Sequence, residues 1–107
     1  MGKNQFIVVF ITARDAEEAK KISTALVDQR LIACANVVSG VQSIFSWQGK
    51  IDQADEVLMI LKTKKSVFSK LVKTVKSLHS YDVSEIIALP ILAGSRDYLE
   101  WVNQSAG

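Results

Sequence analysis

The sequence predicts an α+β domain in which two helices cover one face of a four-stranded antiparallel sheet. Apolar, β-branched runs and amphipathic segments follow each other in the order β-α-β-β-α-β. The runs at 6–12 and 57–61 are apolar at nearly every position, as is typical of central strands. No linker or repeat divides the 107 residues, so we expect a single domain over residues 1–107. The simplest such fold is the ferredoxin-like βαββαβ sandwich, followed here by a C-terminal helix.

The first helix is predicted from a capping pattern and a helical apolar repeat. Asp15 stands three residues before Glu18, an acidic pair of the kind that marks helix N-termini. Ala19, Ile22 and Leu26 follow at helical spacing and share one face. We therefore expect this face to pack against the sheet.

The middle of the chain is predicted to form a long hairpin. Residues 33–47 are interpreted as one strand with a bend or bulge near Ser39–Gly40, because a lone glycine in a strand often marks such a bend. Gln48–Gly49–Lys50 then turns the chain. Residues 57–63 return as the third strand.

A second helix, a fourth strand and a short last helix complete the prediction. Residues 66–78 carry apolar side chains on one face and lysines on the other, with Ser66 as the expected N-cap. Residues 86–92 form the fourth strand. Pro90 predicts that this strand lies at a sheet edge or contains a bulge, because proline lacks the N–H that a central strand needs. The last helix is expected over residues 96–103.

The central strands also predict an oligomer. Two helices cover only one face of the sheet, yet these strands are apolar on both faces. Leaving several large apolar side chains in water would cost several kcal/mol, at about 25 cal/mol per Å². We therefore expect the last helix, another subunit or both to cover the second face, and the protein to be an obligate homo-oligomer. Trp47, at the tip of the long hairpin, is the expected anchor of the subunit interface.

Composition limits the classes of partner. The net charge of +2 is too small by itself to indicate a nucleic-acid-binding protein. The lysines between positions 62 and 76 are interpreted as a solvated helix face rather than as a nucleic-acid surface. No apolar run approaches the roughly 20 residues that span a bilayer. A single cysteine, Cys34, cannot form an intrachain disulfide and suits a reducing compartment, so we expect a cytoplasmic protein.

The turn between the second helix and the fourth strand holds the candidate metal ligands. It contains the only histidine, His79, followed by Asp82 and Glu85. Imidazole nitrogen and carboxylate oxygens can together bind a divalent cation such as copper or zinc. The alternative is that His79 caps the end of the helix and that the carboxylates are surface groups. The spacing leaves both interpretations open.

Six short segments, spread along the chain, resemble one protein family. They are Ala33-Cys34-Ala35-Asn36-Val37, Trp47-Gln48-Gly49-Lys50-Ile51, Lys62-Thr63, His79-Ser80-Tyr81-Asp82-Val83-Ser84-Glu85-Ile86, Leu89-Pro90-Ile91 and Tyr98-Leu99-x-Trp101. In this order and spacing they resemble the CutA divalent-cation tolerance family over essentially the whole chain. The resemblance implies a ferredoxin-like subunit in a tight homotrimer with intersubunit strand pairing. It also implies an architecture similar to that of the PII-type nitrogen signalling proteins.

The candidate turn departs from the pattern of that family. The family turn usually contains His-Pro-Tyr-Glu-x-Pro-Glu, whereas Ser80 and Ser84 replace both prolines here, which predicts a more flexible turn. For some members the resemblance also implies copper ligands at a first-strand cysteine and at paired histidines. Ile11 and Leu78 stand at two of these positions, so His79 alone remains of that set.

Two classes of function follow from the residues and the resemblance. The first is a trimeric protein of divalent-cation tolerance, copper above all, that binds cations weakly or acts indirectly. The second is a PII-like sensor or assembly scaffold that binds a small anionic metabolite in an intersubunit cleft, with Lys62, Tyr81 and Trp101 as its walls. No Ser-His-Asp or Cys-His spacing indicates a catalytic centre, so we expect no enzymatic activity.

Overall fold

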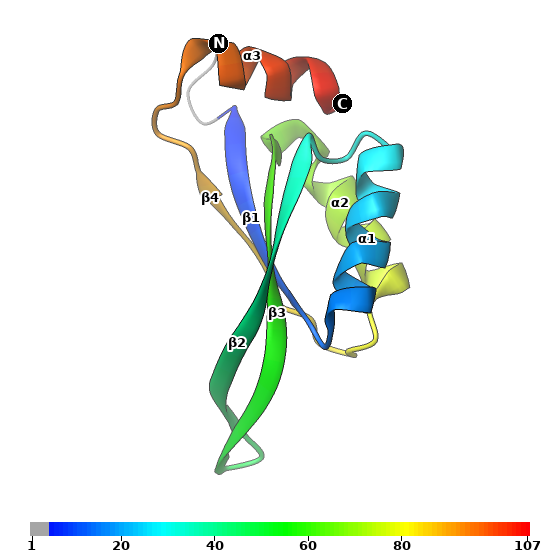
Figure 1. Cartoon of the computed structure of the whole chain (residues 1–107), viewed down its shortest axis with the longest axis vertical. Helices are drawn as coiled ribbons and strands as arrows, with labels where there is room; N and C mark the ends of the chain where they lie inside the picture. The colour runs from blue at the N-terminus through cyan, green and yellow to red at the C-terminus, as the bar shows by residue number, and fades with distance from the viewer. Residues whose placement is uncertain (1–4) are drawn as a thin grey trace.

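The computed structural model describes residues 5–107 as one four-stranded sheet with three α-helices (Figure 1). In chain order the elements are β1 (Phe6–Ala13), α1 (Ala16–Asp28), β2 (Cys34–Trp47), β3 (Lys50–Lys64), a 3₁₀ turn (Lys65–Val67), α2 (Phe68–Leu78), β4 (Ile86–Pro90) and α3 (Arg96–Ser105). The strands lie in the order β2-β3-β1-β4, and each neighbouring pair is antiparallel. The predicted ferredoxin-like sandwich, with the first and third strands at its centre, is confirmed.

The main core lies between the sheet and the two helices α1 and α2. Ala19, Ile22 and Leu26, the predicted inner face of α1, have no exposed surface. They meet every second side chain of the central strands, namely Ile7, Val9, Ile11, Ala13, Val57, Met59 and Leu61. Leu71 and Val75 of α2 complete this layer. Each buried aliphatic side chain of this size stabilises the fold by about 1.5–3 kcal/mol relative to exposure.

The two main helices begin differently. Asp15 is the N-cap of α1, and its carboxylate accepts the backbone N–H of Glu18 at 2.8 Å, as predicted. The predicted cap of α2 at Ser66 is wrong, because Ser66 already belongs to the 3₁₀ turn that precedes the helix. Val67 stands at the N-cap of α2, and no side chain in the described part of the chain caps this helix end.

The predicted long hairpin is confirmed and is longer than expected. β2 has 14 residues and β3 has 15, and the register shifts between Val38 and Val41, where Gly40 has a φ of +80°. At the tip, Gln48 and Gly49 both have positive φ, the geometry of a tight type I′ hairpin loop. β3 begins at Lys50 rather than at residue 57, because its polar first half pairs with β2 beyond the helices (Figure 1).

The fourth strand and the last helix close the ends of the sheet. β4 pairs only with β1, so Pro90 lies on an edge strand, as predicted. Val102 of α3 is fully buried against Phe6 and Ala33, which forms a second, smaller core. Helix α3 thus covers one end of the second face of the sheet (Figure 1). None of the helices within residues 5–107 has the length and apolar character needed to cross a membrane.

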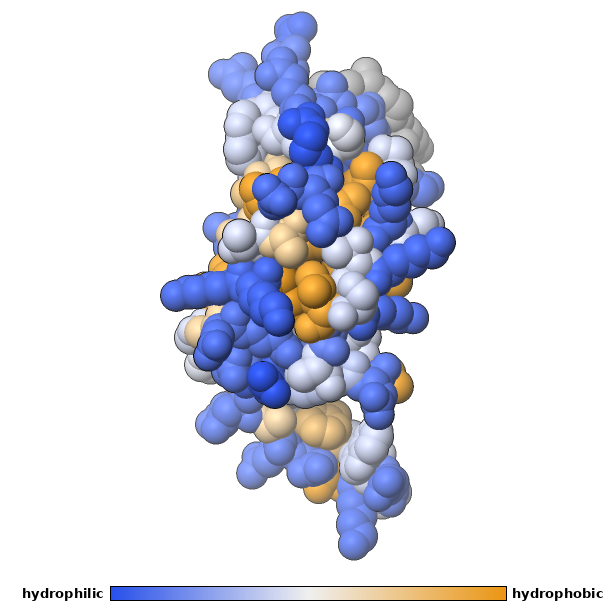
Figure 2. Space-filling model, turned by 90° about the vertical axis from the view of Figure 1, so that its right-hand side faces the viewer, coloured by the Kyte–Doolittle hydropathy of each residue, from blue (hydrophilic) through white to orange (hydrophobic). Residues whose placement is uncertain are grey.

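Residues 5–107 leave most of the second face only partly covered. We call it the open face; it consists of Val8, Phe10, Val38, Leu58, Ile60, Ile87 and Leu89. Ile87 and Leu89 are about half exposed, at 52% and 50%. The opposite side, formed by the outer surfaces of the helices, is mostly hydrophilic, with only small apolar areas (Figure 2). An apolar surface of this kind marks a contact site, as the sequence predicted.

Candidate functional site

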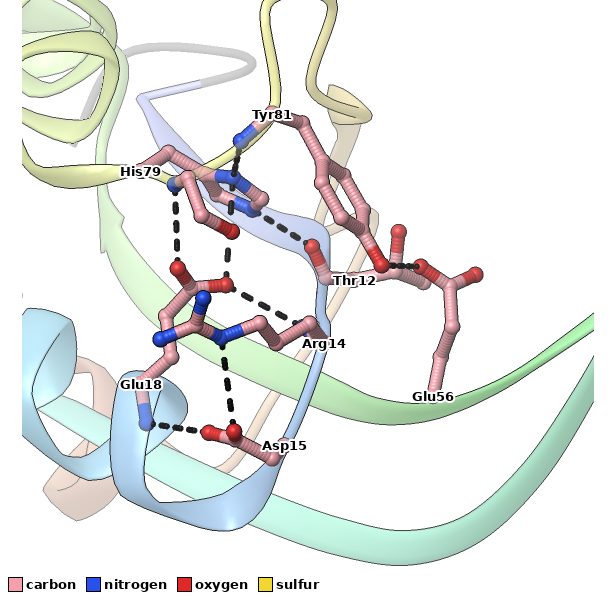
Figure 3. Close-up of polar contacts among 8 residues, drawn as sticks. Thr12, Arg14, Asp15, Glu18, Glu56, His79 and Tyr81 are labelled. Carbon is pink, nitrogen blue, oxygen red and sulfur yellow. Dashed lines mark hydrogen bonds and ion pairs between the residues drawn. The ribbon is translucent and has the colours of Figure 1, made fainter.

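The His79 side chain lies inside the fold, at the point where α2 ends. Its backbone N–H donates to the carbonyl of Val75 at 2.8 Å, and its extended backbone then leads the chain away from the helix. The imidazole has no exposed surface. Nε2 donates to the Thr12 carbonyl of β1 at 2.7 Å, while Nδ1 accepts the backbone N–H of Tyr81 at 3.1 Å (Figure 3). These two bonds require the neutral tautomer that carries its hydrogen on Nε2.

Glu18 connects α1 to the same turn. Its carboxylate is 6% exposed and accepts the backbone N–H groups of Arg14 at 3.1 Å and of Ser80 at 2.9 Å. One carboxylate oxygen lies 3.9 Å from Nδ1 of His79 (Figure 3). Burial acts to raise the pKa of Glu18, but the hydrogen bonds that its carboxylate accepts from Ser80 and Arg14 lower it overall. Glu18 is therefore an ionised, hydrogen-bonded carboxylate that holds the turn to the start of α1.

Tyr81 connects the turn to β3. Its hydroxyl donates to a carboxylate oxygen of Glu56 at 2.9 Å, and its ring lies against the ring of His79 with centroids 4.8 Å apart (Figure 3). Burial and the carboxylate of Glu56 raise the pKa of Tyr81 to about 12. The phenol is therefore a stable donor at neutral pH, and the turn is anchored to three separate elements.

The structure does not bring the predicted metal ligands together. Asp82 and Glu85 are exposed, whereas the side chain of His79 is buried and both of its ring nitrogens are in hydrogen bonds. Within residues 5–107, no three His, Cys, Asp or Glu side chains form a group that could hold a metal ion. Ile11 is fully buried in the core and offers no donor. The residues present therefore do not fit a preformed metal centre in this turn, and the ligand assignment stays a prediction.

A second polar cluster lies on the far end of the sheet, beside α3. Lys62 and Cys34 are directly opposite each other on β3 and β2, and the ammonium of Lys62 donates to the side-chain oxygen of Asn36. The thiol of Cys34 lies 3.3 Å from the hydroxyl of Tyr98, whose ring centroid lies 5.6 Å from that of Trp101. Burial and the hydrogen bond with Cys34 raise the pKa of Tyr98 to about 12. We call these five residues the lysine cluster.

The three residues predicted to line a ligand cleft lie in two places. Lys62 and Trp101 belong to the lysine cluster, whereas Tyr81 bonds to Glu56, six residues away along β3. At about 3.3 Å per residue, that separation is roughly 20 Å. One cleft could contain all three only if two subunits contribute to it.

Two features of these sites were not predicted from the sequence. Glu18 was assigned only to the start of α1, although its carboxylate also binds the turn through Ser80. The contact between Cys34 and Tyr98 was also missed, although both residues lie in segments that resemble the family. Trp47, the predicted interface residue, is 57% exposed at the end of β2 and free to contact another subunit.

Comparison with known proteins identifies the family. The family described as CutA1 divalent ion tolerance protein matches residues 7–105. A protein of Thermus thermophilus named Divalent-cation tolerance protein CutA is 47% identical over 94% of this chain and 97% of its own length. Protein CutA, chloroplastic, of Arabidopsis thaliana is 43% identical over 92% of this chain but only 54% of its own length. The chain thus spans nearly all of the bacterial relative and about half of the plant one.

Solved structures agree with the sequence comparison. The divalent cation tolerance protein Cut A1 from Thermus thermophilus superposes with a TM-score of 0.94 at 46% identity, covering 95% of this chain and 99% of the other. CutA1 from Oryza sativa gives the same TM-score at 39% identity, covering 98% and 96%. Both the sequence and the arrangement of its elements therefore show that the chain belongs to the CutA1 divalent ion tolerance protein family.

Proposed function

We propose that this chain assembles into a homotrimer and contributes to the tolerance of divalent cations. The open face carries the first part of the proposal, because its apolar side chains are only partly covered within residues 5–107 and a partner subunit would bury them. The free edges of β2 and β4 are available for the intersubunit strand pairing that the resemblance implies. The names of the relatives support the second part.

The trimer is tested by light scattering and by Trp47→Ala. We expect three subunits at low micromolar concentration. In the trimer the indole is buried against a neighbour, so its removal should lower the free energy of unfolding by about 3–5 kcal/mol. Ser46→Ala changes an exposed neighbour on the same strand and serves as the control. A folded wild-type monomer, or an unchanged melting temperature in Trp47→Ala, would contradict the proposal.

We further propose that the protein responds to copper weakly or indirectly, without a preformed site at His79. Coordination by either ring nitrogen would require loss of the bond to Thr12 or to Tyr81. In His79→Ala we expect a copper affinity within twofold of the wild type. We also expect a clear loss of stability, because each buried group left unpaired costs about 1–3 kcal/mol. Isothermal titration calorimetry with Cu²⁺ and urea unfolding measure these two effects.

The double variant Asp82→Ala and Glu85→Ala is the matched test of the exposed carboxylates. Both side chains are exposed, so the variant should fold as the wild type does.

If His79→Ala weakens Cu²⁺ binding tenfold or more while the trimer persists, His79 is a metal ligand and the turn must rearrange to bind. If the wild type does not bind Cu²⁺ at all, its role in tolerance is indirect.

The second candidate function is a PII-like sensor or scaffold that binds a small anion between subunits. The lysine cluster favours it, since an ammonium, an amide and two aromatic rings gather at one end of the open face. Calorimetry with a panel of nucleotides and carboxylates, run beside Cu²⁺ and Zn²⁺, separates the two functions.

A further inference from the structure

Among residues 5–107, no carboxylate forms an ion pair with Lys62. Its side chain is partly buried on the second face of the sheet, between Cys34 of β2 and Val8 of β1, its two cross-strand neighbours. Leu89 of β4 lies in the same row, beyond Val8. The ammonium donates to the neutral amide of Asn36, and the ion pairs among residues 5–107 do not include Lys62. A single chain tolerates this arrangement because water still reaches the lysine.

Assembly raises the free-energy cost of leaving the Lys62 ammonium without a negative partner. Any subunit that covers the open face also removes water from Lys62, which lies in a row with Val8 and Leu89. A buried ammonium without a partner costs several kcal/mol, which exceeds the roughly 1.5–3 kcal/mol gained by burying one leucine. A negative charge near Lys62 would therefore stabilise the trimer further. This inference rests on the trimer proposed above.

The surroundings of Lys62 indicate what kind of anion would fit. Tyr98 and Trp101 present a pair of tilted rings that are 40% and 44% exposed. The hydrogen bond between Tyr98 and Cys34 holds this pair beside the strand position opposite Lys62. Exposed aromatic rings bind planar groups by stacking, and a lysine binds oxyanions as a point charge. A series of neighbours links the two features, because Lys62 faces Cys34 across the strands, Cys34 contacts Tyr98, and Tyr98 lies beside Trp101.

We propose that the lysine cluster binds a small organic anion that carries a planar ring and a phosphate or carboxylate group. Lys62 and Asn36 contact the oxyanion, and Trp101 and Tyr98 contact the ring. Cys34 is a positioning residue, because its contact with Tyr98 orients the ring pair. The competing source of negative charge is a carboxylate of a neighbouring subunit, which the experiment below distinguishes.

The test is isothermal titration calorimetry of the full chain at fixed ionic strength with four probes. AMP carries a ring and a phosphate, and benzoate carries a ring and a carboxylate. Inorganic phosphate lacks the ring, and adenosine lacks the charge. We expect AMP or benzoate to bind at least tenfold more tightly than inorganic phosphate and adenosine.

Three variants assign the binding to the cluster. Lys62→Met should lower the affinity for the ring-bearing anion at least tenfold. Lys65→Met, which changes an exposed lysine in the 3₁₀ turn, should leave its affinity unchanged. Trp101→Ala should reduce the affinity for the ring-bearing anion to that for inorganic phosphate and should not change the latter.

Each contrary result has a defined meaning. If the trimer binds none of the probes and Lys62→Met lowers its melting temperature, a neighbour's carboxylate is the partner of Lys62 and the anion site is overturned. Equal losses in Lys62→Met and Lys65→Met would also overturn it, because binding would then be nonspecific. Light scattering on the same samples keeps the two proposals separate. A monomer contradicts the trimer, whereas a trimer without probe binding contradicts only the anion site.

Discussion

Ile87→Asp is expected to convert the trimer into a folded monomer. Ile87 is 52% exposed on the open face, so a single chain can carry a carboxylate there at little cost. In the trimer the same carboxylate would lie in an apolar contact without a partner, at a cost of several kcal/mol for each subunit. Light scattering should therefore report one subunit, while circular dichroism keeps the spectrum of the wild type.

Lys73→Asp is the control for this variant. It introduces the same carboxylate at an exposed position on α2, on the hydrophilic helix side of the molecule. We expect this variant to remain a trimer. If Ile87→Asp also remains a trimer, the open face is not the subunit contact, and another surface must hold the chains together.

Glu18→Gln is expected to lower the free energy of unfolding at neutral pH. It should also make that free energy depend less on pH in acid. The carboxylate accepts two backbone N–H groups, whereas a Gln amide can accept only through its oxygen and turns an NH₂ toward the other donor. The unpaired group should cost about 1–3 kcal/mol. The folded-state pKa of Glu18 is below its ordinary value of 4.5. Its contribution to stability is therefore present above that value and is lost as the pH falls through the lowered pKa.

Urea unfolding of both proteins between pH 7 and the acid limit, at one protein concentration, measures this effect. The wild type should lose stability below about pH 4.5 more steeply than Glu18→Gln does. Glu17→Gln is the matched control, since it makes the same change at an exposed residue one position earlier. Equal results for the two variants would show that the buried bonds of Glu18 contribute nothing to stability.

The sequence contained most of the information about the fold. Strands apolar on both faces were predicted to be central, and β1 and β3 are. A lone Gly40 predicted the bulge, and Pro90 predicted an edge strand. These signals are local, because they depend on which side chains a strand can bury and on which backbone angles a residue can adopt. The start of β3 was missed because residues 50–56 are mostly polar and exposed, and such a composition is as typical of a loop as of a solvated strand.

The sites depended on contacts that no local pattern contains. The spacing of His79, Asp82 and Glu85 predicted that they could lie near each other, yet the imidazole points inward to Thr12, 67 positions earlier. The bond between Ser80 and Glu18 joins residues 62 positions apart. A period of 2 or 3.6 residues assigns a side chain to a face, but it does not say which distant group that face meets.

The exposed tip of the hairpin affects the order in which the protein folds and assembles. The outer half of β2 and β3 reaches past the helices (Figure 1), and Ile44 and Ile51 there are 71% and 86% exposed. A newly made chain can complete its helix-covered core alone, in a first-order process whose rate is independent of dilution. The apolar side chains of the tip become buried only on encounter with other chains, so the rate of this burial increases with protein concentration. An unassembled subunit therefore exposes apolar side chains at the tip, which makes it more prone to aggregation than the assembled protein.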